Sequence, residues 1–151
     1  MKKIIAAISA LVLLFTLAGC NLFLKEETTV YVYEEEYLSS KLTYYHKGDS
    51  VTKQTVENIL YYEGIGWTES DTKEYFEVFY EEYEKLDGVV YEVVYEEDHV
   101  VEKVEINWEE VDIDQITSSG LIEFEGDIEN GISLEESEQL VTASGYVKQE
   151  D

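Results

Sequence analysis

The clearest secondary-structure signal in the chain lies at residues 89–108, VVYEVVYEEDHVVEKVEINW. Apolar and polar side chains alternate along much of both halves, which is the period of a β-strand whose two faces meet different surroundings. The acidic segment at residues 97–99 separates the two halves and is typical of a turn. We therefore expect an antiparallel hairpin made of residues 89–97 and 100–108.

Three further strands are predicted upstream of this hairpin. They are residues 28–37, 38–47 and 50–62. Their β-branched and aromatic side chains favour strands, and Gly48-Asp49 marks a turn before the third. Because the breaks between them are short, we expect an antiparallel meander. The alternation of the third strand is imperfect, since Glu57 and Asn58 interrupt it.

Two helices are predicted, one on each side of the hairpin. The first, at residues 70–86, has apolar side chains spaced three and four residues apart: Phe76, Phe79, Tyr80, Tyr83 and Leu86. The second begins after Ser133, which forms a capping-box pattern with Glu136. Weaker signals predict a helical turn at residues 112–119 and an extended segment at residues 122–124.

These elements together predict an α+β fold with one sheet. We expect about five antiparallel strands, arranged as a three-strand meander, a helix and a hairpin, with the amphipathic helix and the C-terminal helix packed on one face. A length of 151 residues fits one domain, which we place at residues 28–151. A hydrophobic fraction of 44% argues against intrinsic disorder.

The first 19 residues have the pattern of a lipoprotein signal peptide. Two Lys precede an uncharged run of 14 residues at positions 4–17, which is shorter than the ~20 apolar residues of a membrane-spanning helix. The run ends in a lipobox: Leu17, Ala18, Gly19 and Cys20. We expect diacylglycerol on the Cys20 thiol, cleavage before it, and a short tether over residues 20–27. This predicts a lipid-anchored protein on the extracytoplasmic face of the cell membrane.

The charge of the chain limits its partners. Ten Lys, no Arg and 35 Asp plus Glu give a net charge of −25, and removal of residues 1–19 takes away two Lys and no acid, which leaves −27. Nucleic acid is excluded as a partner, because binding to phosphates requires a basic surface. The tether reaches at most ~25 Å, so the domain is expected close to a bilayer that repels it.

The chain resembles the YehR-like family of small bacterial lipoproteins, a family with a domain of unknown function. The resemblance rests on the lipobox and on the order and spacing of short motifs at residues 48–55, 57–58, 104–106, 112–114, 131–133 and 145–146. It implies a compact α+β fold and an envelope lipoprotein, and it implies no activity. The chain departs from the family pattern in its lack of Arg and Pro and in its acidity.

The sequence offers no catalytic motif. Gly-x-Ser-x-Gly is absent, the sole Cys is the predicted lipid-attachment residue, and the only two histidines, His46 and His99, lie beside predicted turns. Acidic pairs recur, but 35 acids produce such pairs by chance. Glu57 is the one acid that interrupts a predicted strand, and a bend or a packing role is the simpler interpretation. We predict no catalytic residue.

Metal and cofactor sites are also not predicted. Two separated His and no free Cys do not fit a structural zinc site. The best calcium candidate is the acidic segment at residues 127–131, DIENG, whose spacing does not match an EF-hand loop. An acidic turn before a capped helix is the simpler interpretation.

The function expected from these observations is binding without catalysis. Twelve of the 13 Tyr lie between Tyr31 and Tyr95, and aromatic rings beside carboxylates suit a cationic peptide, a protein or a cell-wall ligand. The alternatives are a cell-wall hydrolase that uses an acidic pair and a passive structural lipoprotein. A pocket with two converging carboxylates would favour the hydrolase.

Overall fold

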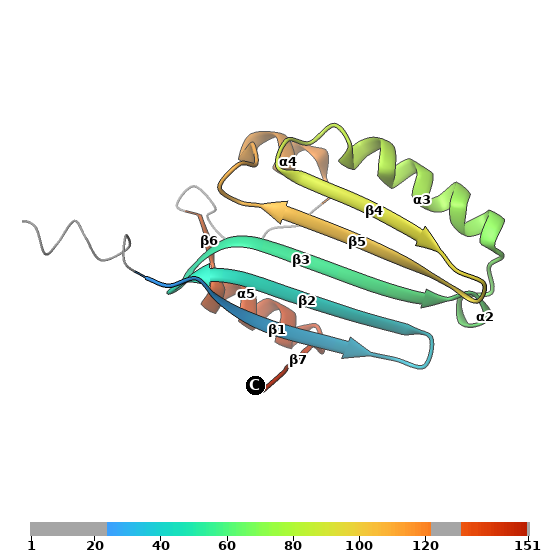
Figure 1. Ribbon diagram of the computed structural model, residues 1–151, viewed down its shortest axis with the longest axis horizontal. Helices are drawn as coiled ribbons and strands as arrows, with labels where there is room; N and C mark the ends of the chain where they lie inside the picture. Colours follow the sequence, from blue (N-terminus) through green and yellow to red (C-terminus); the bar gives the residue numbers. More distant parts are fainter. Residues whose placement is uncertain (1–23, 122–130, 151) are drawn as a thin grey trace, which may run out of the picture.

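The computed structural model describes residues 24–121 and 131–150. Its elements follow one another along the chain as β1 (Glu27–Glu34), β2 (Leu38–Lys47), β3 (Ser50–Tyr61), α2 (Tyr62–Ile65), α3 (Glu69–Tyr83), β4 (Val89–Tyr95), β5 (His99–Asn107), α4 (Ile113–Ser119), β6 (Ile132–Ser133), α5 (Leu134–Ala143) and β7 (Val147–Lys148). In this part of the chain, all strands join one antiparallel sheet in the order β4-β5-β3-β2-β1-β7, with β6 beside the start of β3 (Figure 1).

The sheet has seven strands where about five were expected. The five long strands confirm the predicted meander and hairpin, and the two additional ones are β6 and β7, of two residues each. β6 pairs Ile132 with Val51, and β7 pairs Val147 with Val32. A two-residue strand has no periodicity to detect, so tertiary pairing alone defines it.

Several expected details differ from the structure; for example, the first strand ends at Glu34 and the fourth at Tyr95, where residues 37 and 97 were expected. β3 runs without a break through Glu57 and Asn58, because both lie in register with β2 and β5. α3 ends at Tyr83, three residues earlier than expected, since Lys85 donates its backbone N–H to the carbonyl of Glu82 in a tighter turn. The helical turn expected at residues 112–119 is present as α4.

Both long helices cover the same face of the sheet. Leu42 lies opposite Val56, and Val56 lies opposite Val104, so these side chains project to one side. α5 packs Leu134 and Val141 on this side, over β1, β2 and β3. α3 covers β4 and β5, where the following residues pack together: Phe76, Tyr83, Leu86, Val100, Ile106 and Ile116. This confirms the expectation of an α+β domain with helices on one face.

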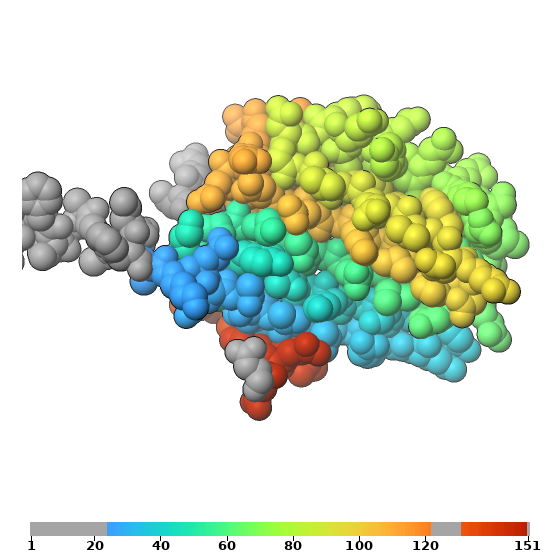
Figure 2. All heavy atoms as spheres, in the orientation of Figure 1, coloured from blue at the N-terminus to red at the C-terminus, as the bar shows by residue number. Residues whose placement is uncertain are grey.

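The opposite face of the sheet is open among the described residues. In Figure 2, strands β1, β2 and β3 face the viewer with no helix over them. Lys41, Lys53 and Lys103 project from this face, and Lys53 and Lys103 pair with Glu105 and Glu57 at 3.4 and 3.6 Å. The open face is therefore mixed in charge. The covered face carries the apolar core.

Side-chain caps fix where the helices begin. Thr68 accepts the backbone N–H of Asp71 at 3.2 Å, and Asp71 accepts that of Thr68 at 2.9 Å, which completes a capping box for α3. Ser133 accepts the N–H of Glu136 at 3.2 Å, as the sequence predicted for α5. These caps define the first residues of α3 and α5.

Candidate ligand-binding groove

A groove of about 470 Å³ lies on the helix-covered face of the sheet, between α3 and the segment after α5. Its residues come from α3 (Tyr75, Phe76, Phe79, Tyr83), from the C-terminal segment (Ser144, Tyr146) and from the sheet (Tyr33, Leu38, Ser40, Asn58, Leu60, Glu102). The groove exists because α3 and α5 pack over different halves of the sheet. Its volume falls within the range of small-molecule sites.

The floor of the groove is a row of polar side chains across three strands. Ser40 on β2 lies opposite Asn58 on β3, which lies opposite Glu102 on β5. Because paired residues of neighbouring strands project to the same face, the three side chains meet. Ser40 Oγ donates to Asn58 Oδ1 at 2.6 Å, and Asn58 Nδ2 donates to Glu102 Oε2 at 2.8 Å.

The hydrogen bonds of this row all run toward Glu102. An ionised carboxylate only accepts, so Asn58 must present its NH₂ group to Glu102 and its carbonyl oxygen to Ser40. The Ser40 hydroxyl therefore receives the hydrogen of Tyr146, whose oxygen lies 2.8 Å away. Tyr91 donates from the other side to Glu102 Oε1 at 2.7 Å. Hydrogen bonds in such a chain polarise one another.

The charge of Glu102 acts on the tyrosines around it. Burial raises the pKa of Tyr91, and the hydrogen bond to Glu102 and its negative charge raise this pKa further. Burial also raises the pKa of Tyr83, with a smaller contribution from the charge of Glu102. The rings of Tyr83 and Tyr91 stack with centroids 4.7 Å apart. Both phenols therefore remain protonated at neutral pH, and Tyr91 donates its hydrogen bond to Glu102.

Aromatic rings form the walls of the groove. Phe76 and Tyr83 of α3 are buried, and Tyr75 contacts Phe79 with ring centroids 5.0 Å apart. On the other side, Tyr33 and Tyr146 contact each other at 5.5 Å. Such walls favour an apolar or aromatic body above the polar floor.

Glu102 has no cationic partner among the described residues. Each ion pair seen in this part of the chain involves another carboxylate. Its neighbour Lys103 projects to the open face and pairs with Glu57. Glu102 is also the one carboxylate among the described residues that line the groove.

The residues considered as catalytic candidates from the sequence, Glu57, His46 and His99, lie outside this groove. Glu57 is on the open face. His46 is buried at the end of β2, where it contacts Thr29 Oγ1 at 3.0 Å and the carbonyl of Gly48 at 2.8 Å. His99 contacts Asp98 and the ring of Tyr61.

Other predicted sites lie outside the described residues. These are the signal peptide, the lipobox with Cys20, the extended segment at residues 122–124 and most of the acidic segment at residues 127–131. Over residues 24–121 and 131–150, no group of three or more His, Cys, Asp or Glu is arranged to hold a metal ion. In the same residues no helix is long and apolar enough to span a membrane.

The polar row is not among the features predicted from the sequence, although the sequence contains a signal for it. Ser40, Asn58 and Glu102 each fall on the side of their strand that is otherwise apolar: Leu38, Leu42, Val56, Leu60, Val100 and Val104 share that side. A polar residue in phase with apolar neighbours marks a buried polar contact or a site. Only the pairing of the strands shows that the three positions coincide.

Comparison with known proteins identifies the family. A family model described as a protein of unknown function, DUF1307, matches residues 27–147. The chain belongs to the DUF1307 family. It is 30% identical over 147 residues to the uncharacterized lipoprotein Lmo0207 of Listeria monocytogenes, covering 97% of this chain and 95% of that one. It is also 30% identical over 147 residues to the uncharacterized lipoprotein YehR of Escherichia coli, covering 96% and 95%.

Solved structures of similar proteins show the same fold. The NMR structure of E. coli YehR matches with a TM-score of 0.70 and 27% identity, covering 83% of this chain and 92% of that one. An NMR structure of a Streptococcus pneumoniae protein matches with a TM-score of 0.55 and 13% identity, covering 83% and 86%, which concerns the fold alone. The resemblance to the YehR-like family is thereby confirmed. The DUF1307 relatives are named lipoproteins, which supports membrane anchoring through a lipid.

Proposed function

We propose that this DUF1307 lipoprotein binds another envelope component, without chemical conversion, in the groove between α3 and the segment after α5. The observation that carries the proposal is the combination of aromatic walls with the polar row Ser40–Asn58–Glu102 at the floor. The occupant has an apolar or aromatic body that fits between the walls. It ends in a hydrogen-bond donor, because the floor ends in the carboxylate of Glu102, which can only accept.

The location of the groove suits a ligand away from the bilayer. The proposed tether, residues 20–27, enters the fold at Glu27, at the start of β1. Tyr33, which lines the groove, lies six residues further along the same strand, or roughly 20 Å at the rise of an extended chain. The groove is therefore on the half of the domain farther from the proposed anchor.

The hydrolase alternative has less support. Two-carboxylate hydrolysis of a sugar polymer requires two acids flanking one bond. Glu102 is the single carboxylate in the described lining of the groove. Both of its oxygens already accept hydrogen bonds, from Asn58 and Tyr91.

Site-specific photo-crosslinking in intact cells tests the proposal. A benzophenone amino acid replaces Tyr75, a groove residue that is 46% exposed, or Val78, a residue of the same helix that is 62% exposed and does not line the groove. We expect a discrete adduct from position 75 and none from position 78. Ser144→Trp, which fills the edge of the groove, should remove the adduct, whereas Thr142→Trp, outside the groove, should not. Equal labelling from both positions, or no adduct, would favour the passive structural role.

A further inference from the structure

We infer that the ligand of this groove carries a primary ammonium group, which binds Glu102 while its organic body lies against the aromatic walls. The inference rests on the proposed function and adds the chemical class of the ligand. Four observations support it: the unpaired charge of Glu102, the direction of its hydrogen bonds, the rings around it and the charge of the whole chain.

Hydrogen bonds fix the carboxylate of Glu102, but none of its described partners carries a positive charge. Asn58 and Tyr91 each occupy one of its oxygens, at 2.8 and 2.7 Å. Both donors are neutral, so the negative charge remains. Each carboxylate oxygen has two lone-pair directions, which leaves one on each oxygen for a donor from the groove. A half-buried carboxylate of this kind gains most from a cationic donor, because charge-assisted hydrogen bonds are about twice as strong as neutral ones.

No side chain of the described protein supplies that cation. Lys103 is directed to the opposite face by the alternation of β5. On the helix-covered side, Lys73, Lys85 and Lys148 form ion pairs with Glu69, Glu82 and Glu138. A cation for Glu102 must therefore come from another molecule.

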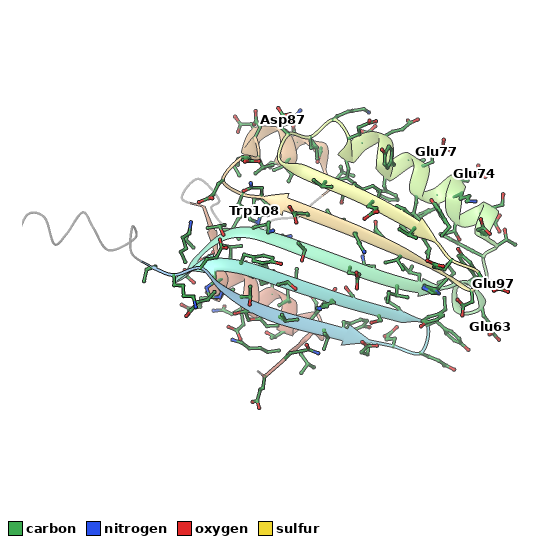
Figure 3. All side chains as sticks on the ribbon, viewed as in Figure 1. Glu63, Glu74, Glu77, Asp87, Glu97 and Trp108 are labelled. Carbon is green, nitrogen blue, oxygen red and sulfur yellow. The ribbon has the colours of Figure 1, made fainter. Side chains whose placement is uncertain are left out.

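The surroundings favour a cation and disfavour an anion. Phe79 and Tyr83 line the same groove as Glu102, and aromatic rings attract an ammonium group through their negative faces. Glu74 and Glu77 add negative charge to α3, the helix that forms one wall of the groove (Figure 3). The chain as a whole carries a net charge of −25, which raises the local concentration of cations and lowers that of anions such as phosphates and carboxylates.

A ligand titration that compares two probes of equal shape tests the inference. The lipidated full chain in non-ionic detergent is titrated with 2-phenylethylamine and with 2-phenylethanol, and binding is followed through the NMR signals of the tyrosine rings. We expect the amine to bind at least about tenfold more tightly than the alcohol, as one charge-assisted contact predicts. Because this comparison uses the unaltered protein, it does not depend on the folding of a variant.

Two matched variants locate the effect. Glu102→Gln should weaken binding of the amine about tenfold or more and leave binding of the alcohol nearly unchanged. Glu105→Gln removes the same charge from the same strand, but its side chain pairs with Lys53 on the open face, so it should change binding of the amine less than twofold. An equal loss in both variants would mean diffuse attraction by net charge and would overturn the inference.

The remaining outcomes separate this inference from the proposed function. If both probes bind equally and both are displaced in Ser144→Trp, the groove binds ligands but does not select an ammonium group. If neither probe binds the wild type while the crosslink at position 75 persists, the ammonium assignment is wrong and the proposed function stands. If the amine binds as expected, titration with 1,5-diaminopentane and with acetyl-Gly-Lys-Gly-amide distinguishes a free amine from a lysine side chain of a peptide as the source of the ammonium group.

Discussion

Asn58 lies directly opposite Glu102 in the β3–β5 ladder, and its side-chain amide donates to the Glu102 carboxylate at 2.8 Å. The two residues are 44 positions apart in the sequence. The same amide accepts from Ser40, a residue that is only 3% exposed. Asn58 therefore connects a buried hydroxyl to a partly buried charge, and it holds the floor of the groove together.

Replacement of Asn58 should destabilise the fold measurably. Asn58→Leu removes the acceptor of the Ser40 hydroxyl and one donor of Glu102, and unsatisfied buried polar groups cost about 1–3 kcal/mol. Urea unfolding of this variant should show a lower midpoint with an unchanged slope. Thr55→Leu, on the same strand but on the open face, serves as the control and should change the midpoint by less than half as much. Equal effects of the two variants would show that the polar row contributes nothing to stability.

Much of this architecture follows from the sequence. The apolar and polar alternation of residues 89–108 predicts β4 and β5, and the stripe that includes Phe76 and Tyr83 predicts α3. Ser133 gives the start of α5. These signals are local, since each depends on residues within one strand or one to two helical turns.

The groove does not follow from the sequence, because it is a product of long-range register. Asn58 and Glu102 could face each other only after β3 and β5 had paired, and a shift of one residue would turn either side chain to the open face. Glu57 and Asn58 both interrupt the alternation of the predicted third strand, yet Glu57 projects to the opposite side and pairs with Lys103. The strands β6 and β7 likewise exist only through their partners.

Gly64 lies in close contact with an aromatic ring. A Cβ atom at this position would lie 1.8 Å from the Tyr37 ring, so Gly64→Ala should displace the ring and destabilise the fold by about 1–3 kcal/mol. Gly66 is the matched control. It adopts a φ of +69° and a Cβ there meets nothing within 4 Å, so Gly66→Ala should cost only the backbone strain of about 1–2 kcal/mol.

A second substitution distinguishes the two causes in thermal unfolding. Tyr37→Gly should recover much of the loss caused by Gly64→Ala, because it removes both the ring and the Tyr37 Cβ, which would lie 2.0 Å from the new Cβ at position 64. The same substitution should not rescue Gly66→Ala, whose cost lies in its own backbone. Failure of Tyr37→Gly to restore any stability to Gly64→Ala would contradict the close contact.

The capping box of α3 predicts a pH effect on stability. Hydrogen bonds from the side chain and the backbone N–H of Thr68 lower the pKa of Asp71 below its ordinary value of 3.8. A lowered folded-state pKa stabilises the protein above the unfolded pKa, and this contribution is lost as the pH falls through and below 3.8. The melting temperature of Asp71→Asn should therefore fall less over this range than that of the wild type.

Glu74→Gln is the control for this pH effect, because Glu74 lies on the same helix and outside the capping box. Its acid-induced loss of stability should follow the wild type. If Asp71→Asn and the wild type gave parallel curves of melting temperature against pH, the Asp71 carboxylate would not contribute to the start of α3.

Lipid attachment at Cys20 is the prediction on which the placement of the groove relative to the membrane depends. Cells that express the full chain should incorporate labelled palmitate into it, and Cys20→Ser should abolish both the label and recovery in the membrane fraction. Ser9→Ala, a substitution of equally small size within the apolar run, is the control and should retain the label. A wild-type protein that stays unlabelled would contradict the lipobox. The domain would then not be held near the bilayer by Cys20, and the expected position of the groove relative to the membrane would no longer apply.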